Sequence, residues 1–102
     1  MIEEINKLAQ QQHELAWQAY RAYLPVVEDI EATQTNDTNQ ISLVLDYMLG
    51  FCFDAQMLTL YRRLCRYLYA IHPETAVFYV SAYREMWDEE GNQFGNNKEA
   101  NR

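Results

Sequence analysis

The amino-acid sequence predicts an all-α fold, a small bundle of about four helices, on the basis of three observations. Apolar residues recur at spacings of three and four through most of the chain, as they do on one face of a helix. Glycine and proline are scarce, and the stretch from Ile2 to Tyr23 contains neither. Residues that commonly begin helices, Asp54 and Pro73 among them, stand just ahead of periodic segments.

The first predicted helix runs from Ile2 past Tyr23. Gln12 occupies one slot of a heptad-like seam whose other slots are apolar. These slots hold Ile5, Leu8, Leu15, Ala19, Ala22 and Val26. Because the seam spans fewer than four heptads, it is more typical of one face of a bundle helix than of a coiled coil. A dimer seam in which Gln12 fixes the register is the alternative.

A proline and a polar segment follow this helix. Pro25 lacks a backbone N–H and disfavours helical geometry at Leu24, so we expect the helix to kink or to restart there. Apolar residues within 26–30 predict a short continuation. Residues 33–40 include no apolar side chain and predict an exposed loop. The candidate caps of the next helix are Asp37, Thr38 and Asn39.

The run 41–49 fits either a buried strand or a helix, because a short apolar run cannot be assigned by its period alone. We predict a helix that Gly50 ends or bends. Residues 55–71 carry the clearest helical pattern, with apolar side chains over one wide arc and a narrow polar strip. The arc holds Met57, Leu58, Leu60, Tyr61, Leu64, Cys65, Tyr67, Leu68, Tyr69 and Ile71. This helix is therefore predicted to be central, with neighbours on most sides.

His72 and Pro73 end the central helix, and Pro73 with Glu74 is a favourable first turn for another. Residues 77–80 alone are compatible with a strand, but the Pro-Glu start favours a last helix. Its recurring residues are Ala76, Tyr79, Val80, Tyr83, Met86 and Trp87. We predict one helical domain over residues 1–91 and a flexible tail over 92–102, which is rich in asparagine and glycine.

Composition and charge limit the class of protein. A chain of 102 residues with 49% hydrophobic side chains can bury a core without disulfides or metals. The longest apolar run, residues 47–53, is far shorter than the roughly 20 residues of a membrane helix. Glu3 and Glu4 stand where a secretory signal carries positive charge, so we expect a cytoplasmic protein with no membrane association. Cys52 and Cys65 are expected to be reduced and buried.

The sequence carries no recognisable catalytic, metal-binding or cofactor-binding pattern. The two histidines are far apart, and no CxxC, HxxxH, Gly-rich phosphate loop or GxSxG is present. We therefore predict a protein that is not an enzyme and uses no cofactor or metal. A small enzyme with a site assembled from His72, Cys65 and distant carboxylates is the least supported alternative.

One strip of the central helix has the chemistry to bind an anionic partner. Arg62, Arg63 and Arg66 share it, and Tyr67 and Tyr69 flank it. Guanidinium groups make forked hydrogen bonds to carboxylates and phosphates. The competing interpretation, which we favour, is that these arginines form salt bridges to acidic residues of the first or last helix.

The aromatic content of 14% exceeds what a narrow core readily hides, so Trp17 and Trp87 are further candidates for a binding surface. We predict a regulatory or interaction module that binds a protein partner and self-associates as a homodimer. A nucleic-acid-binding regulator that uses the arginine strip is the first alternative, although a net charge of −7 disfavours it. The second is an acidic mimic that occupies a nucleic-acid-binding protein.

Overall fold

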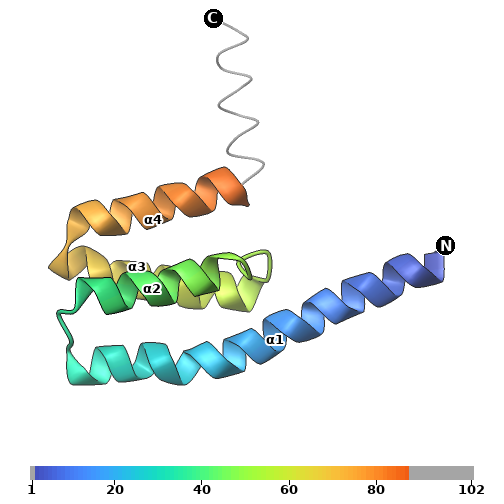
Figure 1. Cartoon of the computed structure of the whole chain (residues 1–102), viewed down its shortest axis with the longest axis horizontal. Coiled ribbons are helices and arrows are strands. Elements are labelled where there is room, and N and C mark those ends of the chain that lie inside the picture. The colour runs from blue at the N-terminus through green and yellow to red at the C-terminus, as the bar shows by residue number, and fades with distance from the viewer. Residues whose placement is uncertain (1, 88–102) are drawn as a thin grey trace, which may run out of the picture.

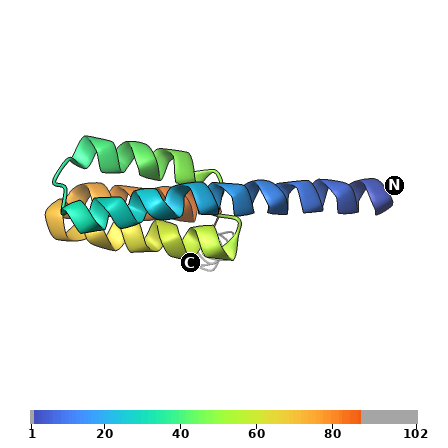
Figure 2. The same cartoon turned by 90° about the horizontal axis from the view of Figure 1, so that it is seen from below.

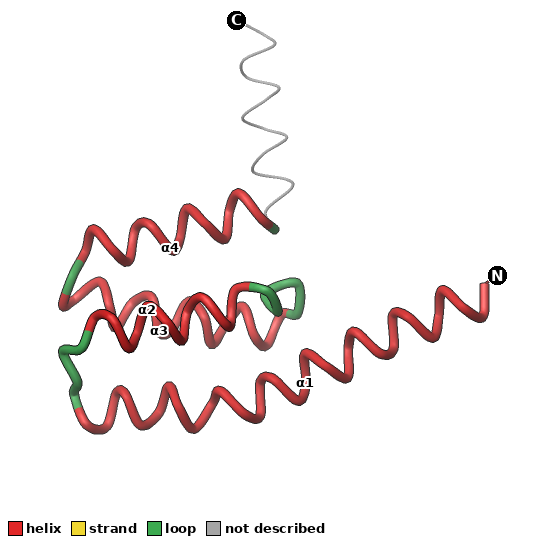
Figure 3. Tube along the Cα trace, viewed as in Figure 1, coloured by secondary structure: helices red, strands yellow, loops and turns green. Residues whose placement is uncertain are grey.

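The computed structural model describes residues 2–87, with side chains from residue 6 onward, and this part of the chain contains four helices and no strand (Figures 1 and 3). They are α1 (Ile2–Thr33), α2 (Thr38–Leu49), α3 (Ala55–Ile71) and α4 (Pro73–Met86). The predicted all-α bundle is confirmed. The predicted end of the domain at residue 91 and the tail over 92–102 lie outside the described residues.

Helix α3 is the centre of the bundle, as its wide apolar arc predicts. It packs against each of the other three helices, whereas α1 and α4 lie on opposite sides of the α2–α3 pair (Figures 1 and 2). The largest side chains at the centre of the core have less than 2% of their surface exposed. These are Val27, Ile30, Ile41, Leu45, Met48, Met57, Tyr61, Leu64 and Leu68.

Helix α1 is continuous through Pro25, so the restart that we considered there is wrong. Proline leaves the carbonyl four residues earlier, at Arg21, without its helical hydrogen bond. Both Pro25 and Arg21 are exposed, so water can satisfy that carbonyl and the helix tolerates the ring. The predicted continuation is confirmed, because Val27 and Ile30 are buried.

The connections between helices follow the predicted caps. Asp37 is the N-cap of α2 and accepts a hydrogen bond from the Gln40 amide. The loop between α1 and α2 covers residues 34–37 and is shorter than the predicted loop over 33–40. Asp54 is the N-cap of α3, and its side chain accepts hydrogen bonds from the amides of Gln56 and Met57. The segment 41–49 is helical, which resolves the ambiguity between strand and helix.

Two outward faces depart from the sequence prediction. In α4, Ala76 and Tyr79 are buried, but Val80 and Met86 are about half exposed. In α3, Tyr69 is also exposed. The physical reason is that α4 packs mainly on α3 and reaches only the edge of α2, so one stripe of α4 suffices to meet its neighbours.

The first half of α1 projects beyond the end of the bundle (Figures 1 and 2). All described side chains from residue 6 to residue 15 are exposed. The predicted seam is therefore buried only in part: Ala19 lies in the core, whereas Leu8, Leu15 and Ala22 face solvent. The bundle therefore leaves Leu8 and Leu15 of this projecting half more than half exposed.

Candidate functional site

The arginine strip of α3 is divided between two sides of the helix. Arg63 turns toward α1 and forms a bidentate ion pair with Glu31, in which the Arg63 Nε donates to Oε2 at 2.9 Å and Nη2 donates to Oε1 at 2.5 Å. The guanidinium lowers the pKa of the Glu31 carboxyl, chiefly through these hydrogen bonds. The favoured interpretation, a salt bridge between helices, therefore holds for Arg63.

Tyr67 has a structural role beside this ion pair. Its hydroxyl donates to the Thr35 carbonyl at 2.9 Å, which ties α3 to the loop after α1. Arg63 and Tyr67 thus both connect α3 to the end of α1, and both are partly buried. Both side chains therefore have hydrogen-bond partners within the chain.

Arg62 and Arg66 lie on the other side of α3, where a groove separates α3 from α4. Both are exposed, and among the described residues neither forms an ion pair. The groove has a volume of about 440 Å³. Its lining is Arg62, Cys65, Arg66, Tyr69, Ala76, Val77, Val80, Ser81 and Arg84.

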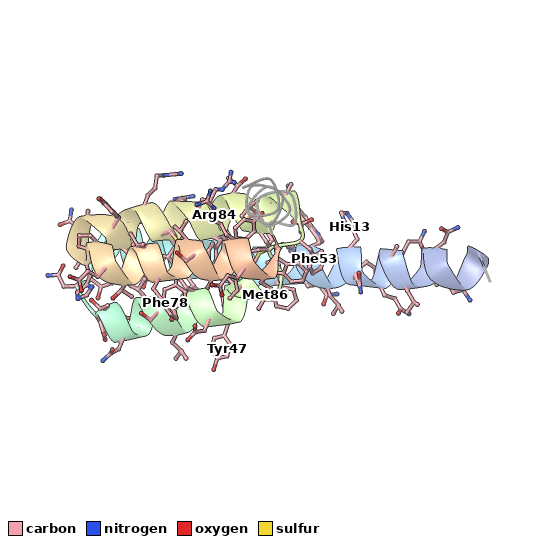
Figure 4. All side chains as sticks on the ribbon, turned by 90° about the horizontal axis from the view of Figure 1, so that it is seen from above. His13, Tyr47, Phe53, Phe78, Arg84 and Met86 are labelled. Atoms are coloured by element: carbon pink, nitrogen blue, oxygen red, sulfur yellow. The ribbon has the colours of Figure 1, made fainter. Side chains whose placement is uncertain are left out.

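A second, smaller hollow extends the groove toward the end of α4. It has a volume of about 180 Å³ and shares Arg62, Cys65, Val80 and Arg84 with the first. Figure 4 labels Arg84 on the side of α4 that faces α3. Among the described residues, the two hollows are lined by three arginines and by no carboxylate. The groove therefore combines an apolar wall with positive charge.

The cysteine in this groove is poorly suited to nucleophilic chemistry. Cys65 is 4% exposed, and burial raises the pKa of its thiol to about 12. A thiol with this pKa is protonated at neutral pH, whereas the reactive form is the thiolate. Burial also raises the pKa of the neighbouring Tyr61 hydroxyl, which donates to the Tyr79 carbonyl at 2.6 Å. These groups contribute packing and hydrogen bonding.

The two histidines have local partners. His72 joins α3 to α4, and its Nδ1 accepts a hydrogen bond from the Thr75 amide at 3.3 Å, so its ring caps the start of α4. The Nδ1 atom of His13 on α1 lies 3.9 Å from Oδ1 of Asp54, the N-cap of α3. Within residues 6–87, no three side chains of the metal-ligating kinds come together. No helix of the described chain is both long and apolar enough to cross a bilayer.

The two tryptophans lie away from the groove. The Trp87 indole N–H donates a hydrogen bond to the Leu49 carbonyl at 2.6 Å, and its ring centroid lies 5.7 Å from that of Phe53. These contacts connect the end of α4 to the end of α2. Trp17 is 46% exposed and stacks on Tyr20 along α1. Of the predicted site residues, the structure therefore brings together Arg62, Arg66 and Tyr69, and separates the others from them.

The contribution of α4 to the groove was not predicted from the sequence. Val77, Val80 and Arg84 supply its second wall. Their spacings of three and four residues place them on one helix face, and this was the available signal. The face was overlooked because the neighbouring stripe through Ala76 and Tyr79 is also apolar and is the one that α3 covers.

No protein-family model, curated protein or solved structure was found to be similar to this chain.

Proposed function

We propose that this chain is a protein-binding module that holds an apolar, carboxylate-bearing segment of a partner protein in the α3–α4 groove. The observation that carries the proposal is the pairing of an apolar wall with Arg62 and Arg66 in one hollow. The module regulates or connects its partner without catalysing a reaction, and it acts in the cytoplasm.

The groove has the features of a peptide-recognition site. A volume of about 440 Å³ accommodates several apolar side chains, and Val77 and Val80 offer the surface for them. Exposed guanidinium groups form bidentate hydrogen bonds with carboxylates, which fixes the register of a bound segment. Tyr69 adds a large apolar ring with a polar tip, a combination enriched at protein interfaces.

A protein partner fits these features better than a nucleic acid. Arg63 is already paired with Glu31, so the strip offers two arginines rather than three for an external anion. The net charge of −7 opposes approach to a polyanion at long range. Apolar wall surface also contributes little to contacts with a phosphate backbone, whereas it stabilises a protein complex.

The test is affinity capture of the tagged full chain from its native lysate, with and without nuclease, followed by mass spectrometry. Arg66→Glu and Val80→Asp change the groove. Arg21→Glu and Leu43→Asp make the same chemical changes at exposed positions on α1 and α2. We expect a stoichiometric, nuclease-resistant protein that the groove variants lose and the control variants keep.

Two outcomes contradict the proposal. Retention that disappears with nuclease assigns the arginines to nucleic-acid binding. Equal loss in groove and control variants shows that the groove is not the binding surface. Circular dichroism of each variant confirms that the helices are intact, because exposed substitutions of this kind usually change the free energy of unfolding by less than about 0.5 kcal/mol.

A further inference from the structure

The α3–α4 groove carries positive charge that its own walls do not neutralise. Arg62 and Arg66 line it, both are exposed, and neither forms an ion pair among the described residues. Within that part of the chain, the groove lining also includes no carboxylate. Its apolar wall includes Val77, which is 54% exposed, and Val80, which is 45% exposed. A ligand that satisfies both features carries carboxylates close to an apolar side chain.

The chain has a segment of this chemistry directly after α4. Residues 88–90 are Asp-Glu-Glu, and Phe94 follows four residues after Glu90. This acidic segment, residues 88–94, contains three acidic side chains and no basic one, so its charge is complementary to that of the groove. Gly91 lies between the carboxylates and the aromatic ring, where a glycine permits a reversal of chain direction.

The acidic segment begins at one end of the groove. The Trp87 amide donates to the carbonyl of Tyr83, and Tyr83 lines the smaller hollow that extends the groove. A helix rises about 1.5 Å per residue, so Val80 lies about 10 Å and Val77 about 15 Å back along α4 from Trp87. Residues 88–94 span up to about 23 Å when extended. The acidic segment is therefore long enough to return along the groove.

We infer that the acidic segment binds in the α3–α4 groove of its own chain. Its carboxylates pair with Arg62 and Arg66, which form forked hydrogen bonds with such groups. The Phe94 ring packs on the apolar wall of α4. Because the segment is joined to α4, its effective concentration at the groove is high, and contacts too weak to hold a free peptide suffice.

The consequence is regulation of the groove, and in this respect the inference rests on the proposed function. The acidic segment has the carboxylates and the apolar side chain proposed for the partner, so the two compete for one site. A partner gains access only in the fraction of molecules whose groove is empty, which lowers its apparent affinity. Binding of the acidic segment itself can be measured without any partner.

Photo-crosslinking of the purified full chain at low concentration tests the intramolecular contact. A benzophenone amino acid in place of Phe94 keeps an aromatic ring at this position. We expect a product with the mass of a single chain, in which peptide mass spectrometry finds position 94 joined to the groove lining, at Tyr69, Val77 or Val80. Attachment points spread over all four helices, or absent from the groove, overturn the inference. A product with the mass of two chains overturns the intramolecular contact.

Charge reversal tests the role of the arginines. Arg62→Glu/Arg66→Glu should lower the yield of the groove crosslink about tenfold, because repulsion replaces two ion pairs. Lys7→Glu/Arg21→Glu makes the same change in charge at exposed positions of α1 and should leave the yield unchanged. Equal losses in the two variants contradict a specific pairing. Circular dichroism of both confirms that the helices are intact.

A compensating change separates attraction from damage to the groove. Glu89→Arg/Glu90→Arg, added to the Arg62→Glu/Arg66→Glu chain, returns opposite charges to the two sides and should restore most of the crosslink. Failure to restore it overturns the ion pairs.

Capture of the partner distinguishes this inference from the proposed function. Asp88→Asn/Glu89→Gln/Glu90→Gln should raise the apparent affinity for the captured protein at least about twofold, because a groove that is occupied half of the time binds with half its intrinsic affinity. No rise overturns the competition. A captured partner without a groove crosslink overturns this inference and leaves the proposed function standing. A groove crosslink without a captured partner does the reverse.

Discussion

The two halves of α1 have similar apolar periodicity but opposite environments. In the second half, Val27 and Ile30 are fully buried and Glu31 is paired with Arg63 of α3. In the first half, Leu8 and Leu15 are exposed on a helix that extends past the bundle (Figure 1). A helical apolar pattern thus predicts a face that needs cover, but it does not say whether the cover comes from the same chain.

The same distinction separates the two sides of α3. Toward α1, Arg63 and Tyr67 have partners within the chain, at Glu31 and Thr35. Toward α4, Arg62 and Arg66 line an open groove. In both cases the side with internal partners stabilises the fold, and the open side is where we place binding.

The largest effect expected from this comparison is in the core half of α1. Ile30→Ala removes a fully buried side chain and should lower the free energy of unfolding by about 2–5 kcal/mol. Leu8→Ala in the same helix should lower it by less than about 0.5 kcal/mol when the chain is monomeric. Urea unfolding at low protein concentration measures both. Similar losses in the two variants would mean that the halves do not differ in packing.

An intermediate effect is expected at the hydrogen bond from Tyr61 to the Tyr79 carbonyl. Because Tyr79 lies inside α4, its carbonyl keeps the helical hydrogen bond when Tyr61→Phe removes the hydroxyl donor, so this change should lower the free energy of unfolding by about 0.5–1.5 kcal/mol. The matched control is Tyr47→Phe, because Tyr47 is exposed on α2 and its change should be close to neutral. Thermal unfolding of the two variants compares them. A neutral Tyr61→Phe would contradict the structural role assigned to the hydroxyl.

The smallest effect is expected at the ion pair between α1 and α3. Both side chains are partly exposed, so Glu31→Gln should cost less than about 1 kcal/mol. Since the folded protein lowers the pKa of Glu31, the pair contributes its full stability above the ordinary pKa of 4.5 and loses it as the pH falls through the folded value.

The pH dependence of unfolding measures this effect separately from the size of the substitution. The wild-type chain should lose more stability than Glu31→Gln on acidification below about pH 4.5. Identical acid slopes for the two proteins would show that the carboxylate is not held by Arg63 in solution.

The helix boundaries could be predicted from the sequence because caps act locally. Asp37, Asp54 and the His72–Pro73 corner each lie within a few residues of the amides or turns that they determine. The central place of α3 also followed from its sequence, since a helix that is apolar over most of its surface requires several neighbours.

The site could be predicted only in part, because its geometry depends on long-range packing. Glu31 and Arg63 are 32 residues apart, and no local pattern distinguishes Arg63 from Arg62. The second wall of the groove, with Val77 and Arg84, depends on which stripe of α4 turns toward α3. These assignments depend on how two packed helices are rotated relative to each other. The apolar period of a single helix gives no information about that rotation.

The most direct test of the central claim is photo-crosslinking from inside the groove. A benzophenone amino acid at Val77, in the groove, is compared with the same residue at Leu43, which is equally exposed on α2. Both tagged proteins are irradiated in native lysate after nuclease treatment. The account predicts one discrete protein adduct from position 77 and none from position 43. The same adducts from both positions, or none from position 77, would contradict it.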